Sequence, residues 1–129
     1  MNLAFMQAEK VLGKTNRNPA VGCCVVKNNN LISLASTSYR GRPHAEANAL
    51  KFSQSRLKNS TLYVTLEPCH HYGKTSPCVN KIIDSGIKRV VYSINDIDNR
   101  TAGKACKILK SKKIKVKKNL LKNLSSKLY

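Results

Sequence analysis

Residues 61–94 read TLYVTLEPCHHYGKTSPCVNKIIDSGIKRVVYSI. The short run at 61–66 is rich in β-branched and aromatic side chains and is cut off by Pro68, a pattern that predicts a strand. Residues 79–86 have an amphipathic helical pattern that ends at Gly86, a residue suited to a helix C-cap. Residues 88–94 form a second apolar run and predict another buried strand. Strands that alternate with helices in this way belong to a sheet that helices cover.

Toward the N-terminus the chain predicts one helix and a hairpin. Residues 2–13 repeat apolar positions at near-helical spacing, and a glycine at the end of this range supplies a stop. The β-branched run 20–27 and the run 31–36 are joined by three asparagines, which indicates two strands connected by a turn. Cys23 and Cys24 lie in the first of these runs, and we expect them to be small buried side chains.

The remaining segments complete an α/β pattern. Pro43 opens a helical stretch at 44–57, because proline is tolerated in the first turn of a helix. A helix at 102–112 and a short strand at 114–116 follow, and residues 117–129 are either a last helix or the start of a linker. The sequence therefore predicts one domain over residues 1–129, a three-layer α/β/α fold with a central mixed sheet of about five strands.

The charge of the chain is strongly positive. The 129 residues carry 24 Lys and Arg against 6 Asp and Glu, a formal net charge of +18, and no acidic residue occurs from Asn99 to Tyr129. This balance favours polyanions as partners. However, the cations are spread along the chain and aromatic residues make up only 5% of it, so few side chains could stack on bases. We therefore expect no nucleic-acid partner.

Membrane insertion and secretion are both unexpected. No run approaches the roughly 18 apolar residues that a membrane span needs. The first residues, MNLAFMQAEKVLG, include Gln7, Glu9 and Lys10 where a signal peptide stays apolar. We expect a cytoplasmic protein. In a reducing compartment, clustered cysteines more often bind metal or do chemistry than form disulfides.

Two motifs together predict a catalytic zinc site. His44 and Glu46 occur in PHAE, and Cys69 and Cys78 occur in LEPCHHYGKTSPC. One cysteine directly follows a strand and the other begins a helix, so both thiols can converge at the carboxyl edge of the sheet. Hydrolytic zinc takes three protein ligands and leaves a fourth position for water. A PHAE motif followed by a PC motif and a later cysteine has the order of the deaminase signature, in which one histidine and two cysteines bind zinc and the glutamate is not a ligand.

The predicted chemistry is hydrolytic deamination. Zinc lowers the pKa of its bound water to near 7, and Glu46 would pass that water's proton to a ring nitrogen and later to the departing amine. His70 and His71 leave an alternative open, because either imidazole could be a fourth ligand and make the zinc structural. The loop between the cysteines is short, and we favour a substrate contact for one of these imidazoles.

Over almost its whole length the chain resembles the deaminase domain of bacterial riboflavin biosynthesis, diaminohydroxyphosphoribosylaminopyrimidine deaminase, in the cytidine deaminase superfamily. The stretches that carry the resemblance are GKTNRNPAVGCCVV, GRPHAEANAL, LYVTLEPCHHYGKTSPC and IIDSGIKRVVYSIND. The eight-residue gap between the cysteines is the most specific of these marks. The resemblance implies a cytidine deaminase-like fold, zinc ligands at His44, Cys69 and Cys78, Glu46 as proton carrier, and a pyrimidine pocket lined by Asn18, Ala45 and His71.

The resemblance also implies the substrate and partners. The substrate would be the ribotide 2,5-diamino-6-(5-phosphoribosylamino)pyrimidin-4(3H)-one, deaminated to the 5-aminouracil ribotide and ammonia. Family members are usually fused to a C-terminal reductase, so a reductase domain or a separate reductase is an expected partner, and a homo-oligomer is expected. Arg17 stands where the family has a proline, and the turn at 96–99 lacks the family's prolines. Two other hypotheses are a nucleobase deaminase acting on RNA and a non-catalytic basic module with a structural zinc.

Overall fold

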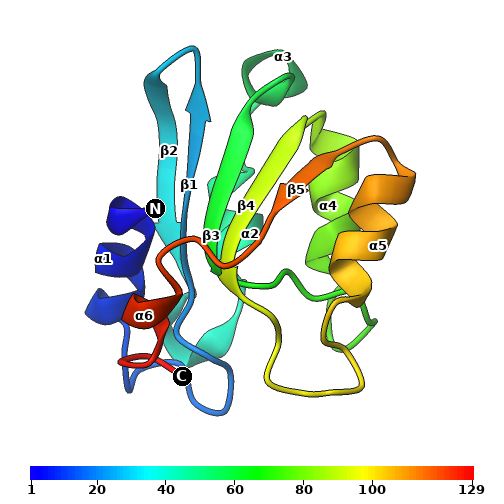
Figure 1. Ribbon diagram of the computed structural model, residues 1–129. Helices are drawn as coiled ribbons and strands as arrows, with labels where there is room; N and C mark the ends of the chain where they lie inside the picture. Colours follow the sequence, from blue (N-terminus) through cyan, green and yellow to red (C-terminus); the bar gives the residue numbers. More distant parts are fainter.

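The computed structural model describes all residues 1–129, and its centre is a five-stranded sheet with the order β2-β1-β3-β4-β5 (Figure 1). The antiparallel strand β1 pairs with β2 and β3, whereas β3, β4 and β5 are parallel to one another. The predicted mixed sheet of about five strands is confirmed. The strands are β1 (Gly22–Lys27), β2 (Asn30–Ser36), β3 (Thr61–Leu66), β4 (Arg89–Ile94) and β5 (Lys115–Lys117).

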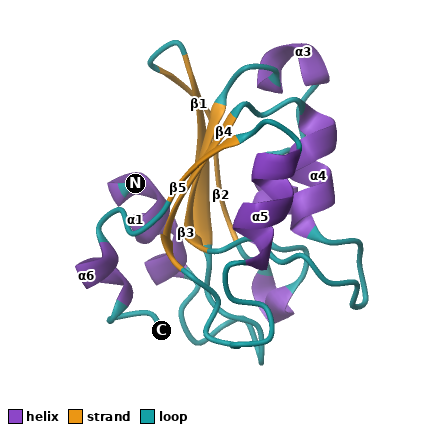
Figure 2. Cartoon of the chain, turned by 45° about the vertical axis from the view of Figure 1, so that its right-hand side comes forward, coloured by secondary structure: helices purple, strands orange, loops and turns teal.

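Helices cover both faces of the sheet, which confirms the three-layer arrangement. In Figure 2, α1 and α6 lie on one face and the other helices lie on the opposite face. None of these helices combines the length and the apolar character that crossing a membrane requires. The helices are α1 (Asn2–Lys10), α2 (Ala45–Ala49), α3 (Gln54–Leu57), α4 (Cys78–Ser85), α5 (Lys104–Ser111) and α6 (Lys122–Ser125), with a short 3-10 turn, η1 (Tyr39–Gly41).

The apolar patterns of the strands fill the core between the sheet and the helices α2, α4 and α5. Alternate side chains of β1 and β3, such as Val25 and Leu62, are fully buried against apolar residues of α2, α4 and α5. Cys23 and Cys24 are both buried, as predicted. The α4 helix ends at Gly86, whose φ of 81° is the left-handed conformation expected of a glycine C-cap.

The prediction of one helix over 44–57 was wrong, because the segment folds as the two short helices α2 and α3. The hydroxyl of Ser33 on β2 donates a hydrogen bond of 2.8 Å to the carbonyl of Ala49, the last residue of α2. Ser53 then adopts an extended conformation and precedes α3 in the N-cap position, which serine favours. A hydrogen bond from a distant strand thus coincides with the end of α2, and the chain is extended at Ser53 before α3 begins.

Strand direction explains where the functional loops meet. Because β1 is antiparallel to both neighbours, β2, β3 and β4 all run in the same direction. The segments that follow these strands, 37–44, 67–77 and 95–103, therefore gather with residues 12–21, which precede β1, at one end of the sheet (Figure 1). This carboxyl edge contains all the residues predicted for the site.

Candidate active site

The position of His44 and Glu46 is set by the start of α2. His44 is the N-cap residue, with φ −66° and ψ 160°, and Glu46 is the second residue of the helix. The helix packs on β1 and β2, so both side chains are held at the carboxyl edge of the sheet. Only 4% of Glu46 is exposed, which removes its carboxyl group from bulk solvent.

The N-terminus of α4 positions both cysteines. Cys69 lies in the loop that follows β3, and Cys78 is the first residue of α4. The backbone N–H of Cys78 donates to the Cys69 sulfur at 3.2 Å, and the N–H of Val79 donates to the Cys69 carbonyl at 3.1 Å. The helix therefore fixes Cys69 by two backbone contacts while it supplies the second thiol itself.

The donor atoms of His44, Cys69 and Cys78 all lie within 4.8 Å of one another. The Nδ1 atom of His44 is 3.7 Å from the sulfur of Cys69 and 3.5 Å from that of Cys78. A tetrahedral zinc with usual bond lengths to nitrogen and sulfur places those atoms about 3.5 Å apart. The donor set and its spacing thus fit zinc. His71 is not part of this group, so the closed four-ligand site of the structural-zinc hypothesis is not formed.

The site perturbs the acidity of its own groups. A hydrogen bond from the Cys78 thiol, with help from His44, lowers the pKa of Cys69 to about 4, and the same bond raises the pKa of Cys78. One sulfur is therefore ready to bind a cation as a thiolate. Burial, and secondarily the charge of Cys69, raises the pKa of Glu46 to about 7.

A cavity of about 170 Å³ lies beside these groups. Its lining includes the zinc ligands His44 and Cys69, together with Glu46. Two of the three residues predicted to line the substrate pocket, Asn18 and His71, also line it. Asn18 donates from its side-chain amide to the carbonyl of Gly41 at 2.8 Å.

Ala45 is the exception among the predicted pocket residues. Its side chain is fully buried and belongs to the apolar core between the sheet and the helices, and it is not among the residues that line the cavity. The first position of α2 directs this side chain into the core while its neighbours on either side reach the cavity. Any substrate contact of Ala45 is therefore left to its backbone.

Sequence reasoning missed Glu67, which also lines the cavity and is 4% exposed. Its Oε2 atom accepts hydrogen bonds from the N–H groups of Asp96 at 3.0 Å and Gly103 at 2.9 Å. The carboxylate therefore ties the loop after β4 to the end of β3. The available signal was an acidic residue directly after a buried strand and two positions before a zinc ligand.

Fold and site together place the chain in the class of zinc-dependent deaminases that act on nucleobases and nucleotides. Residues 1–94 match the model of the cytidine and deoxycytidylate deaminase zinc-binding region. The chain belongs to this family and, within it, to the RibD deaminases of riboflavin biosynthesis. The prediction of a zinc site at His44, Cys69 and Cys78 is thereby confirmed.

Three relatives illustrate the similarity. The chain is 43% identical over 113 residues to the diaminohydroxyphosphoribosylamino-pyrimidine deaminase of Buchnera aphidicola subsp. Schizaphis graminum, covering 88% of this chain and 77% of that one. It is 41% identical over 128 residues to the riboflavin biosynthesis protein RibD of Bacillus amyloliquefaciens, covering 99% of this chain and 34% of the relative.

The third is a crystal structure from Thermotoga maritima, a diaminohydroxyphosphoribosylaminopyrimidine deaminase/5-amino-6-(5-phosphoribosylamino)uracil reductase. It superposes with a TM-score of 0.90 at 39% identity, over 99% of this chain and 38% of that chain. The chain thus spans about a third of the length of the RibD proteins that it matches.

Proposed function

We propose that this chain catalyses the hydrolytic deamination of 2,5-diamino-6-(5-phosphoribosylamino)pyrimidin-4(3H)-one to 5-amino-6-(5-phosphoribosylamino)uracil and ammonia. The observation that carries the proposal is that the buried carboxyl group of Glu46 and the zinc ligands His44 and Cys69 line one small cavity. The name of the Buchnera relative, most of whose length this chain covers, supports the choice of substrate.

The reaction adds one water to C2 of the pyrimidine ring and releases the amino group on that carbon as ammonia. His44, Cys69 and Cys78 would hold the zinc, which would supply a Lewis acid that lowers the pKa of a bound water. Glu46 accepts a proton from the attacking water and donates it to the adjacent ring nitrogen. The same carboxyl group then takes the second proton to the amine, so that the carbon–nitrogen bond breaks with neutral ammonia as the leaving group.

Neighbouring groups would orient the pyrimidine ring. The Asn18 side chain is held by the carbonyl of Gly41, which leaves its Oδ1 atom to accept a hydrogen bond from the ring or its amino group. His71, at the exposed mouth of the cavity, would cover the ring, and the backbone of Ala45 would contact it from the start of α2.

Replacement of the proton carrier tests this function. Glu46→Gln should abolish ammonia release from the diaminopyrimidine ribotide while the protein retains its zinc, as measured by metal analysis. Glu9→Gln, on the exposed side of α1, is the matched control and should keep full activity. Ammonia release by the Glu46→Gln variant at the rate of the control would remove Glu46 from its role.

Several broader properties belong to the same proposal. Residues 1–129 would act as one deaminase domain in the cytoplasm, a compartment that suits its five free cysteines and a thiolate zinc site. Its product would pass to a reductase domain or a separate reductase, as the double name of the Thermotoga protein suggests. The partner at the cavity would be a small ribotide and not a nucleic acid.

The chain would also associate with copies of itself. Exposed apolar side chains gather on α1 and the edge strand β2, including Met6 with 53% of its surface exposed and Leu31 with 51%. Apolar groups on an unpaired edge strand favour contact with a second copy. A homo-oligomer would give a mass above that of the 14.3 kDa monomer in light scattering, whereas a monomeric mass at micromolar concentration would reject it.

A further inference from the structure

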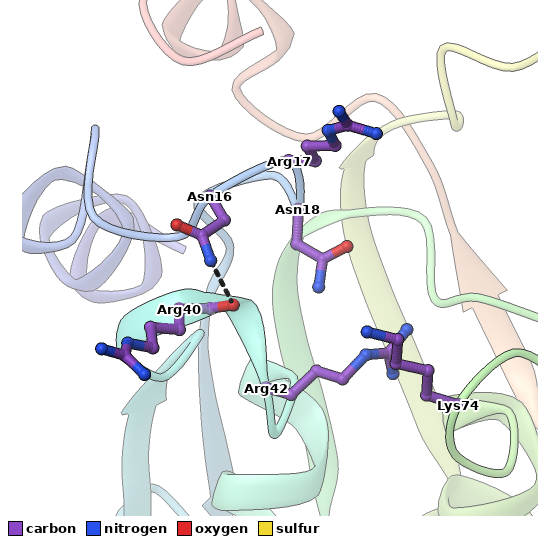
Figure 3. Close-up of a pocket in the computed structure, with 6 residues that line it drawn as sticks. All are labelled: Asn16, Arg17, Asn18, Arg40, Arg42 and Lys74. Atoms are coloured by element: carbon purple, nitrogen blue, oxygen red, sulfur yellow. Dashed lines mark hydrogen bonds between the residues drawn. The ribbon is translucent and has the colours of Figure 1, made fainter.

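A second and larger cavity, of about 760 Å³, adjoins the metal-site cavity. Asn18 and Arg42 line both cavities, so the two adjoin at these residues. The larger cavity has no apolar and no acidic lining residue. Its complete lining is Asn16, Arg17, Asn18, Arg40, Arg42 and Lys74 (Figure 3).

None of the positive charges in this cavity forms an ion pair in the protein, and Arg42 is the one that also lines the inner cavity with its acidic residues Glu46, Glu67 and Asp96. The only ion pair of the chain joins Asp98 and Arg100 at 2.6 Å, outside the cavity. The guanidinium group of Arg42 donates to the neutral hydroxyl of Thr75 at 2.8 Å, which orients it without neutralising it. Guanidinium and ammonium groups that share a cavity with no carboxylate provide the charge and the donors that a phosphate group requires.

The cations differ in where their side chains point. In Figure 3 the side chain of Arg42 extends toward Lys74, whereas Arg17 lies beyond Asn18 with its guanidinium group directed away from Arg42 and Lys74. The guanidinium group of Arg40 points away from them, and its central carbon lies 5.7 Å from the centroid of the Tyr39 ring. Arg40 therefore lines the cavity with its backbone, and its guanidinium group lies against the Tyr39 ring instead.

The volumes of the two cavities suit different parts of a ribotide. Pockets for small organic ligands usually measure roughly 300–1,000 Å³. The inner cavity of about 170 Å³ is below that range and suits a single ring, whereas the outer one of about 760 Å³ has room for a sugar and a phosphate.

On the basis of the deaminase function proposed above, we propose that Arg42 and Lys74 bind the phosphate of the ribotide while its pyrimidine ring occupies the inner cavity. The outer cavity then makes the enzyme selective for the phosphorylated substrate over the corresponding riboside.

The closing experiment compares kcat/KM for the diaminopyrimidine ribotide and for its dephosphorylated riboside. Loss of a charged hydrogen bond to the phosphate should reduce the preference for the ribotide by roughly 10- to 100-fold in Arg42→Gln and in Lys74→Gln, chiefly through KM. Arg40→Gln is the matched control and should keep the preference of the unaltered protein. An equal loss for ribotide and riboside in Arg42→Gln, or the same loss of preference in Arg40→Gln, would overturn the assignment.

A binding measurement separates this inference from the deaminase function. Calorimetric titration of the zinc-loaded protein with inorganic phosphate needs no turnover, and Arg42→Gln should weaken that binding by a similar factor. If phosphate binds in this way but neither pyrimidine is deaminated, the proposed reaction fails and the anion site stands. If phosphate binding is unaltered in Arg42→Gln, or if an RNA oligonucleotide binds through Arg42 and Lys74 more tightly than the ribotide, the assignment to a ribotide phosphate is wrong.

Discussion

Removal of one hydroxyl group, in Tyr129→Phe, should destabilise the whole domain. The Tyr129 hydroxyl donates to the carbonyl of Ala20 at 2.8 Å and lies 2.7 Å from the hydroxyl of Thr65. Because the Tyr129 hydroxyl donates its proton to the Ala20 carbonyl, the Thr65 hydroxyl must be the donor in its bond to Tyr129. The Thr65 oxygen in turn accepts the N–H of Gly22 at 3.2 Å. Burial raises the pKa of Tyr129, so the hydroxyl remains a donor at neutral pH.

The magnitude follows from the partners that remain. Phenylalanine preserves the ring but leaves the carbonyl of Ala20 and the proton of Thr65, which are both buried, without a protein partner. The loss of two such bonds should cost about 2 kcal/mol of unfolding free energy. For a domain of this size the melting temperature should fall by roughly 6–10 °C.

Thermal and urea unfolding, followed by circular dichroism on the zinc-loaded protein, measure this change. Tyr39→Phe is the control, because 71% of that residue is exposed and the change should stay within about 0.5 kcal/mol. If the two variants unfolded at the same temperature, the hydrogen-bonded chain from Tyr129 to β1 would contribute nothing, and the docking of the C-terminal segment would rest on apolar contacts alone.

Three further changes test the packing and the metal site. Gly22→Ala should cost about 3 kcal/mol or more in urea unfolding, because the added Cβ would lie 1.9 Å from a carbonyl oxygen of α1, whereas Gly73→Ala meets nothing closer than 3.6 Å and should be nearly neutral. Cys78→Ser should reduce the zinc content from about one ion per chain to almost none in metal analysis, and Cys106→Ser, away from the metal group, should keep it. Glu67→Ala should cost about 3 kcal/mol in urea unfolding because two backbone N–H groups lose their acceptor, and Glu67→Gln, which keeps one oxygen, should cost less than half as much.

The strands could be predicted from the sequence because their apolar residues come from short continuous runs. The run 61–66 alternates side chains between the two covered faces of the sheet, and β3 has the predicted bounds, Thr61–Leu66. The division of residues 44–57 could not be predicted in this way. It depends on the hydroxyl of Ser33, which reaches the end of α2 only after β2 has joined the sheet. Helix ends that are set by tertiary partners leave no local signal.

The zinc ligands were predictable for a related reason. Each lies in a short motif with a proline before it, and the alternation of strand and helix places both motifs at the same edge of the sheet. The outer cavity had no such signal, because its cations come from three loops that are distant in sequence and lie among 24 Lys and Arg residues. Composition could not distinguish the cations that converge from those that face solvent.

The zinc site and the outer cavity also differ in what holds their residues in place. The zinc ligands are held by backbone structure: His44 occupies the N-cap position of α2, Cys78 begins α4, and Cys69 accepts an N–H from that same helix start. Any shift of these elements would change the spacing of the three donor atoms and weaken zinc binding. Arg42 and Lys74 reach the outer cavity through long side chains on loops, so their positions do not determine the geometry of the metal group. A deaminase of this fold can therefore change how it binds the distal part of its substrate without altering the residues that carry out the chemistry.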